Sequence, residues 1–266
     1  MTIAMVGMGW HSWLFREEMK ALLGDISIIH PRIVTYEIRQ EEISKLNGAA
    51  LLDEVLILGG HSIYPQSSES QISLCEAIGE WAVQNFEEGD FAVRTRKIGE
   101  LPDTISSRSF EDKVGRAVSS SGIRVNLESP SNEIVIIIAG SNEGDTHPEP
   151  FEFEGTMVVW GLRVKNWSKE SFSGRSPTER PYFKPISLEP RQARLLISLS
   201  RVPNREIKAV IDPFCGTGGI AIEAVLQNIR AFASDLDSRM VEGTKENLKW
   251  LGKECLVEKW DASDLS

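Results

Sequence analysis

The sequence predicts a multidomain protein that combines α+β units with a final α/β domain. Its 266 residues exceed the usual size of one domain, so two or three compact units are expected. Apolar runs alternate with helix-period segments over residues 1–165, whereas residues 207–261 follow the order strand, helix, strand, helix, strand. That last order is typical of a parallel sheet packed against helices.

The first unit is expected to span residues 1–65. Its strands are short apolar runs, and its helices carry apolar side chains at intervals of three and four residues. We expect strands at residues 3–6, 32–38 and 54–58 and helices at residues 13–23 and 41–52. The unit is expected to end within residues 59–70, where HSIYPQSSES is rich in turn-forming residues.

The second unit is expected to span residues 66–160. We expect helices at residues 71–86 and 109–122 and strands at residues 91–99, 133–140 and 156–165. Apolar and basic side chains alternate in FAVRTRKIG, which places Arg94 and Arg96 together on an exposed strand face. Ser109 is expected to cap the following helix, because the acidic Asp112 stands three positions later.

A linker is expected at residues 161–187, followed by a domain at residues 188–266. Pro190 suits the first position of a helix, in which Arg191, Arg194 and Arg201 fall within a narrow arc and form one basic face. The rest of this domain alternates regularly. We expect strands at residues 207–212, 231–235 and 255–261 and helices at residues 218–228 and 239–252.

Composition excludes several classes of protein. No apolar run approaches the roughly 18 residues of a membrane span, and the apolar opening lacks the basic region and cleavage site of a signal peptide. The three cysteines and four histidines are too scattered for a disulfide framework or a metal site. We therefore expect a metal-free cytoplasmic protein without a membrane segment.

Charge is distributed unevenly along the chain, whose net charge is -10. Residues 91–126 carry 7 basic and 4 acidic side chains, and residues 161–208 carry 11 basic and 4 acidic ones. Because phosphate contacts require Lys and Arg, these two basic islands are where a nucleic acid would bind. The alternative interpretation is that both islands are ordinary solvated surface.

The stretch DPFCGTGG, residues 212–219, joins an expected strand to an expected helix. Glycines there allow a ligand to approach the backbone, and the helix start offers free N–H groups. The spacing of Gly216, Gly218 and Ala221 also fits a dinucleotide-binding fingerprint. A carboxylate at the strand end repels pyrophosphate, however, so Asp212 favours a cationic ligand such as S-adenosyl-L-methionine, with its ammonium and sulfonium groups.

An acidic residue follows each of the three expected strands of this domain. Asp235 comes 19 residues after Gly216, close to the spacing at which a carboxylate accepts hydrogen bonds from ribose hydroxyls. Asp261 follows the third strand, where it would accept from an adenine amino group. Together with Asp212 these residues form a line of contacts along an adenosyl ligand, although each of them would also suit a helix N-cap.

These features resemble a known family of enzymes. DPFCGTGG followed by ASDLDSRMVEGTKENLKWLG is similar to class I methyltransferases that modify guanine amino groups in RNA. The order of units resembles the THUMP-domain tRNA guanine-N2 methyltransferases of archaea and eukaryotes, which act on guanosine 10 of tRNA. The resemblance implies a ferredoxin-like domain at residues 1–65, a THUMP RNA-binding domain at residues 66–160 and a Rossmann-like, S-adenosylmethionine-dependent methyltransferase domain at residues 188–266.

The resemblance also implies roles for individual residues. It assigns the methionine end of the cofactor to Asp212, Phe214, Gly216 and Gly218, the ribose to Asp235, and the adenine to Asp261 and Ala262. Basic side chains would hold the tRNA through phosphate contacts, which position an RNA without reading its bases. These side chains are Arg94, Arg96, Lys97, Arg108, Lys113, Arg116, Arg191 and Arg194.

The family's Asn- or Asp-Pro-Pro-aromatic motif, which holds the target amine, does not occur in this sequence. No catalytic residue is therefore assigned, and the Rossmann-like domain is expected to be incomplete and truncated at its C-terminus, with a separate chain or segment supplying the rest. The expected function is methylation of the exocyclic N2 of a tRNA guanine. Two alternatives remain, a tRNA-binding THUMP protein with a vestigial methyltransferase half and an NAD-dependent enzyme.

Overall fold

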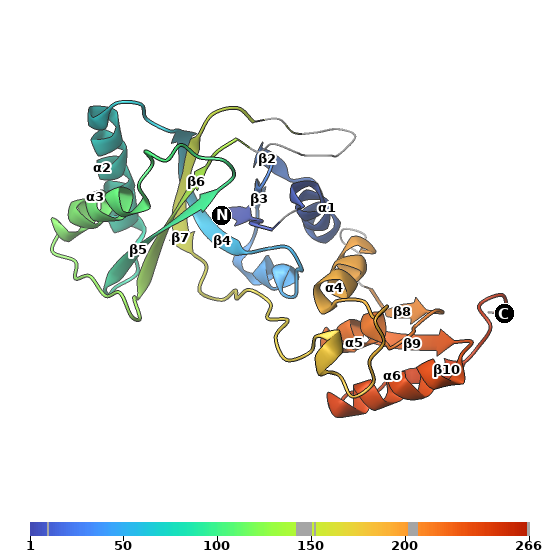
Figure 1. Ribbon diagram of the computed structural model, residues 1–266. Coiled ribbons are helices and arrows are strands. Elements are labelled where there is room, and N and C mark those ends of the chain that lie inside the picture. Colours follow the sequence, from blue (N-terminus) through green and yellow to red (C-terminus); the bar gives the residue numbers. More distant parts are fainter. Residues whose placement is uncertain (10, 142–150, 152, 202–206, 265–266) are drawn as a thin grey trace. The chain divides into compact units, whose positions relative to one another are not determined.

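The computed structural model describes residues 1–9, 11–141, 151, 153–201 and 207–264. The chain forms two compact units (Figure 1). The N-terminal unit comprises residues 1–16, 25–44 and 52–168, and the C-terminal unit comprises residues 17–24, 45–51 and 169–266. The secondary structure is mixed α/β, which confirms the predicted class. None of the helices within the described ranges is long and apolar enough to cross a membrane.

The N-terminal unit is built on one seven-stranded sheet. Its strands are β1 (Thr2–Val6), β2 (Ser27–His30), β3 (Ile33–Glu37), β4 (Glu54–Ile63), β5 (Phe91–Ile98), β6 (Asn132–Ala139) and β7 (Met157–Arg163). They lie in the order β2-β3-β1-β4-β7-β6-β5, and neighbours are antiparallel except β5 and β6. The pairing of β4 with β7 joins the strands of residues 1–65 to those of residues 66–165 in a single sheet.

Strand β6 explains how this sheet forms a core. Its residues Ile134, Ile136 and Ile138 pack in a cluster with the helices α2 (Ser68–Asn85) and α3 (Ser107–Ser119). The alternate residues Val135 and Ile137 belong to a second buried cluster that includes residues of β1 and β4. Because both faces of β6 are buried, its sequence is a continuous apolar run rather than an alternating one.

The C-terminal unit contains a parallel three-stranded sheet in the order β10-β9-β8. Its elements are η2 (Pro177–Glu179), α4 (Pro190–Leu199), β8 (Ala209–Asp212), α5 (Gly219–Leu226), β9 (Arg230–Asp235), α6 (Ser238–Trp250) and β10 (Leu256–Lys259). Ile222 of α5, Ala233 of β9 and Leu248 of α6 lie in one buried cluster with residues of α4 and β10. The predicted alternation of parallel strands with helices is therefore present.

The opposite face of this small sheet is apolar and exposed. Ile211 of β8 and Leu256 of β10 are both in register with Phe232 of β9, which makes a row across the three strands. Ile211 is 67% exposed. The helices of the described part of this unit thus cover one face of the sheet and leave this row in contact with solvent.

Two expectations for the N-terminal unit are wrong at the segment that links its first strands to α2. The helix expected at residues 41–52 is a 3-10 helix, η1 (Gln40–Leu46), and Gly48 follows with a φ of +80°, which a continuing helix does not allow. Strand β4 continues to Ile63, through the stretch expected to be turns. Gly59 and Gly60 lie inside it because the indole of Trp160 occupies the space where their side chains would stand.

Two smaller differences concern the ends and number of elements. Helix α1 (Ser12–Leu23) is followed by β2, a four-residue strand that the sequence did not predict and that forms a hairpin with β3. The N-cap of α3 is Ser106, whose hydroxyl accepts the N–H of Ser109 at 3.3 Å. Ser109 was expected at that position and lies in the first turn instead.

Candidate cofactor site

At two positions of the loop between β8 and α5, the backbone has a conformation that only glycine adopts readily. Gly216 has a φ of +51° and Gly218 a φ of +85°. A methyl group at Gly218 would lie 2.7 Å from Cγ2 of Thr244, whereas nothing lies within 4 Å of the same position at Gly216. The backbone at Gly216 is therefore open to a ligand, and Gly218 is required for the packing of the loop against α6.

Asp212, at the end of β8, is buried and has an unusual electrostatic environment. Its Oδ1 accepts the backbone N–H of Phe214 at 3.2 Å. Burial raises the pKa of Asp212, and the nearby charge of Asp235 raises this pKa further. Two neighbouring carboxylates stabilise a cation between or beside them, which fits the cationic ligand end expected from the sequence.

Asp235, at the end of β9, holds the glycine loop in place. Its Oδ2 accepts the N–H of Gly216 at 3.0 Å, and its Oδ1 accepts the N–H of Asp237 at 2.9 Å. The N-cap of α6 is Asp237 rather than Asp235. Each carboxylate oxygen of Asp235 has further acceptor capacity, so the side chain can still accept from ribose hydroxyls.

The residues assigned to the adenine lie beyond β10. Asp261 is exposed, and its Oδ1 accepts the N–H and the hydroxyl of Ser263 at 3.0 and 2.7 Å. These hydrogen bonds lower the pKa of Asp261. Ala262 is half-buried. The backbone of Trp260 donates to the carbonyl of Asp235 at 3.3 Å, which ties the end of β10 to the end of β9.

A cavity of about 180 Å³ lies against the glycine loop. Residues of the loop and of α5 form one side, and the segment before α4 and Met240 of α6 form the rest. The lining comprises Ile186, Ser187, Leu188, Asp212, Phe214, Cys215, Gly216, Thr217, Gly219, Ile220 and Met240. Of the predicted cofactor residues, Asp212, Phe214 and Gly216 line this cavity, and Gly218, Asp235, Asp261 and Ala262 do not.

The hydrogen bonds of three polar residues that the sequence did not predict, Asn247, Ser187 and Thr244, hold the cavity walls together. The amide of buried Asn247 on α6 donates to the carbonyls of Tyr182 and Thr217, and its oxygen accepts the N–H of Tyr182. The hydroxyl of Thr217 donates to that of Ser187 at 2.8 Å, and the hydroxyl of Thr244 donates to the carbonyl of Gly216 at 2.9 Å. Nothing in the sequence around Asn247, Ser187 or Thr244 marks them for this role.

Cys215 lies inside the loop, but its thiol is not activated. Burial raises the pKa of this thiol to about 11, so it is protonated near neutral pH. The side chain is buried against Thr244, with 3.7 Å between Sγ and the hydroxyl oxygen. It is one of the small residues that line the cavity. Among the described residues no group of three or more His, Cys, Asp or Glu side chains could hold a metal ion.

The basic face expected on α4 is wrong for Arg194. Its side chain is only 2% exposed and bonds to the fully buried Glu223 of α5, with Nη2 to Oε2 at 2.7 Å. Arg175 binds the other oxygen of Glu223 at 2.8 Å and also pairs with Glu170 at 2.7 Å. Arg194 is therefore part of a buried ion-pair cluster. Because α5 packs against α4, the carboxylate of Glu223 binds the guanidinium of Arg194, which is not available to RNA.

The basic residues predicted to bind RNA in the N-terminal unit differ in their surroundings. Arg94 lies 3.7 Å from Glu133 and Arg96 lies 3.5 Å from Glu54, so their charges are partly neutralised on the sheet face. The amine of Lys97 donates to the carbonyl of Ile105. Arg108 and Arg116 on α3 are exposed, as is Lys97 on β5.

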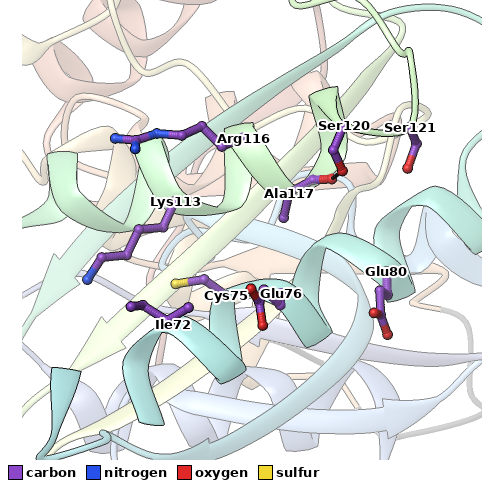
Figure 2. A pocket seen from close by; sticks show the side chains of 9 residues that line it. All are labelled: Ile72, Cys75, Glu76, Glu80, Lys113, Arg116, Ala117, Ser120 and Ser121. Atoms are coloured by element: carbon purple, nitrogen blue, oxygen red, sulfur yellow. Dashed lines mark hydrogen bonds between the residues drawn. The ribbon is translucent and has the colours of Figure 1, made fainter. Parts of the chain in front are cut away.

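A groove of about 710 Å³ lies between α2 and α3. Figure 2 shows Lys113 and Arg116 on the α3 wall and Glu76 and Glu80 on the α2 wall. The amine of Lys113 reaches α2, where it donates to Oε1 of Gln71 at 3.4 Å. Two of the predicted RNA-binding residues thus line one groove, which carries both signs of charge.

Residues 177–266 match the sequence model of a family described as "RMKL-like, methyltransferase domain". The matched part contains the parallel sheet, the glycine loop and all three acidic strand ends. This part of the chain is therefore similar to a methyltransferase domain.

The chain is similar to the tRNA (guanine(10)-N2)-dimethyltransferase of Methanothermobacter thermautotrophicus, with 37% identity over 177 residues. The matched part covers 66% of this chain and 47% of that protein, so the chain spans about half the length of this relative. The resemblance to tRNA guanine-N2 methyltransferases that the sequence predicted is confirmed.

Solved structures share the fold. TrmN from Thermus thermophilus aligns with 100% of this chain and 75% of its own, at 21% identity and a TM-score of 0.55. SMU.472, solved as a complex with SAH, aligns with 100% of this chain and 76% of its own, at 16% identity and a TM-score of 0.53. At these identities the likeness concerns the fold alone.

Proposed function

We propose that the chain contains the tRNA-binding part and the cofactor-binding half of an S-adenosylmethionine-dependent tRNA guanine-N2 methyltransferase. The observation that carries the proposal is the loop after β8, where the buried Asp212 stands beside an open glycine backbone at Gly216. When bound, the cofactor supplies the methyl group to the exocyclic N2 of the guanine. The similarity to the Methanothermobacter enzyme favours position 10 of tRNA as the target.

The residues of the site suit the chemistry of this cofactor. Asp212 would hold the ammonium group, since its carboxylate is buried and close to a second negative charge. Asp235 would accept from the ribose hydroxyls, while Asp261 and Ala262 would border the adenine. Phe214 is 76% exposed and would cover the methionine end. The carboxylates at the loop disfavour the pyrophosphate of NAD, which counts against the third interpretation of the sequence.

A methyltransferase also has to orient its target. The amino group of guanine is a poor nucleophile because its lone pair is delocalised into the ring, so hydrogen-bond acceptors must direct it toward the methyl carbon. The Asn- or Asp-Pro-Pro-aromatic motif expected for this purpose is not among these 266 residues. We propose that residues outside this sequence supply it, either on the same polypeptide or on a separate chain.

We assign tRNA binding to a THUMP domain at residues 66–160, preceded by a ferredoxin-like domain at residues 1–65 and followed by a linker at residues 161–187. The exposed Arg108 and Arg116 and the groove that Lys113 lines favour α3 as the contact surface. A tRNA-binding protein with a vestigial methyltransferase half is the competing proposal. The match of residues 177–266 to a methyltransferase family favours the enzyme.

Isothermal titration calorimetry tests the cofactor assignment. The chain is expected to bind S-adenosylhomocysteine and not NAD. Asp212→Asn keeps the size of the side chain and removes its charge, and it should weaken binding by about 10-fold or more, as expected for a buried charge-assisted contact. Glu246→Gln is the matched control, because it removes one charge from an exposed position on α6. Binding of NAD in preference to S-adenosylhomocysteine would reject the proposal.

A further inference from the structure

Arg180, in the segment between η2 and α4, is a buried guanidinium with unused donors. It is only 4% exposed. Its Nε donates to the carbonyl of Arg175 at 3.2 Å, whereas Nη1 and Nη2 have no hydrogen-bond partner within the described residues. Burying a charged group with unsatisfied donors costs several kcal/mol in general, so this arrangement calls for a functional explanation.

The acids around Arg180 do not satisfy it. Glu223 already forms ion pairs with Arg175 and Arg194. Its charge attracts Arg180, but no hydrogen bond joins the two side chains. Glu189 is also close enough to act electrostatically, but it forms no hydrogen bond with the Arg180 guanidinium. The positive charge of Arg175 repels that of Arg180 and lowers the pKa of the Arg180 guanidinium. The Nη groups of Arg180 thus keep donors that no described residue uses, and they are enclosed beside the cavity rather than part of its lining.

The guanidinium lies directly behind the first residue of α5. A methyl group placed on Gly219 would stand 3.9 Å from Nη1 of Arg180 and 3.4 Å from Cβ of Leu188. Gly219 and Leu188 both line the cavity at the glycine loop. The N-cap of α5 is Gly218, so no side chain caps this helix end. The helix start and the guanidinium therefore give one corner of the cavity a positive potential.

The cavity consequently has two electrostatically different ends. Asp212 lines it with a buried carboxylate, next to the charge of Asp235. Gly219 lines it at the start of α5, in front of Arg180. A ligand group that carries an ammonium and a carboxylate on the same carbon atom matches both ends, and an α-amino acid is such a group.

We propose that Arg180 binds the carboxylate of the amino-acid end of the cofactor and selects cofactors that carry this carboxylate. The inference rests on the proposed function, because it concerns S-adenosylmethionine and its product. Arg180 is then a specificity residue, while Asp212 binds the ammonium group of the same ligand. A nucleoside thioether without the carboxylate loses the contact with Arg180 and keeps the contacts with Asp212 and Asp235.

The test pairs a variant with a change in the ligand. Calorimetry measures the binding of S-adenosylhomocysteine and of its decarboxylated analogue, which keeps the amine, thioether and adenosine. The proteins are the unaltered chain, Arg180→Met, Arg180→Lys and the control Arg230→Met, which removes an exposed arginine at the start of β9. Thermal melting of each variant establishes that it is folded.

Arg180→Met should weaken the binding of S-adenosylhomocysteine by about 10- to 100-fold, the range for a lost charge-assisted hydrogen-bonded contact. It should change the binding of the decarboxylated analogue less than about 2-fold, because that ligand has no carboxylate to lose. Arg180→Lys should give an intermediate loss, and Arg230→Met none. An equal loss for both ligands would mean that Arg180 supports the structure only, and it would overturn the inference.

The unaltered chain provides a second test that does not depend on the folding of a variant. It should bind S-adenosylhomocysteine about 10-fold or more tightly than the decarboxylated analogue. Equal affinity for the two ligands would overturn the role of Arg180 and leave the proposed function intact. Failure to bind either ligand would reject the proposed function itself, so the two failures are distinguishable.

Discussion

The carboxylate of Asp235 accepts the backbone N–H of Gly216 at 3.0 Å and so joins the end of β9 to the loop after β8. Its second oxygen accepts the N–H of Asp237 at the start of α6. One side chain therefore fixes two of the segments that surround the candidate cofactor site. The same carboxylate raises the pKa of Asp212 on the neighbouring strand.

Asp235→Asn should destabilise the C-terminal unit. An amide has one acceptor oxygen, so one of the two backbone N–H groups loses its partner, at a cost of about 1–3 kcal/mol. Urea denaturation should show a lower midpoint with an unchanged slope. Glu246→Gln on the exposed face of α6 serves as the control. An unchanged midpoint for Asp235→Asn would contradict this account of the loop.

Gly218→Ala should destabilise the protein for two separable reasons. The φ of +85° costs an L-residue about 1–2 kcal/mol, and the new methyl group would collide with Cγ2 of Thr244. Gly252→Ala is the matched control for the first effect, since Gly252 has a φ of +63° and no atom within 4 Å of the added carbon.

Thr244→Ser isolates the second effect, because it removes Cγ2 and keeps the hydroxyl that donates to Gly216. Gly218→Ala should therefore cost less in the Thr244→Ser background than in the unaltered chain, by a coupling of about 1 kcal/mol or more. Urea denaturation of the four proteins gives this coupling. Additive effects would show that the collision does not determine the requirement for glycine.

The sequence predicted the elements that depend on local patterns. The helix-period segments predicted α2, α4, α5 and α6, and the apolar run of β6 predicted a strand, which the structure buries on both faces. The carboxylates of Asp212 and Asp235 were placed correctly at strand ends, because strand ends and glycine loops are short-range features. Contacts between distant segments were not predictable in this way. The role of Asn247 depends on Tyr182, which is 65 residues earlier.

Arg194 shows the limit of local reasoning most directly. Its spacing from Arg191 and Arg201 predicts a shared basic face, and only the fold brings Glu223, 29 residues later, against its guanidinium. The wrong prediction of the end of β4 also comes from a distant contact. Glycines such as Gly59 and Gly60 are typical of a turn, but here they lie in a strand because Trp160 packs on them. The periodicity of a sequence predicts on which helix or strand a residue lies. It does not predict which residue from a distant part of the chain will contact that side chain.

Arg194→Met should therefore act on stability and not primarily on RNA binding. Removing Arg194 leaves the buried Glu223 with Arg175 as its remaining ion-pair partner and takes away the hydrogen bond to Oε2, which costs about 1–3 kcal/mol. Arg191→Met on the same helix is the comparison. Its guanidinium lies 5.4 Å from the centre of the Phe172 ring, a contact worth about 1 kcal/mol or less. Equal effects of the two substitutions on the free energy of unfolding would contradict the burial of Arg194.

Ligand binding should depend on pH through Asp212. Its raised pKa means that the folded protein holds this proton more tightly than the unfolded chain does. The contribution of Asp212 to stability therefore falls as the pH rises from the usual Asp range, about pH 4, through the raised pKa. Binding of an ammonium group requires the ionised carboxylate, so affinity for S-adenosylhomocysteine should rise over the same window.

Calorimetry between about pH 4 and pH 7 measures this dependence, because the amino group of the ligand stays protonated throughout. Asp212→Asn should remove the part of the pH dependence that comes from this carboxylate. Asp235→Asn should shift the rise in affinity to lower pH, since it removes the neighbouring charge that raises the pKa of Asp212. The same pH profile in Asp212→Asn as in the unaltered chain would exclude Asp212 as the titrating group.

Substitutions on α3 should weaken tRNA binding more than those on β5. Arg108 and Arg116 are exposed, so each is expected to contact about one phosphate, and alanine at either position should reduce the slope of log K against log salt by about 1. Arg94 lies 3.7 Å from Glu133, and Arg94→Ala should have a smaller effect because this charge is already partly neutralised. Filter binding of tRNA over a salt series measures all three. Arg230→Ala, at the start of β9, is the control for loss of one exposed arginine. A larger effect of Arg94→Ala than of Arg108→Ala or Arg116→Ala would contradict this prediction and would place the RNA on the sheet face.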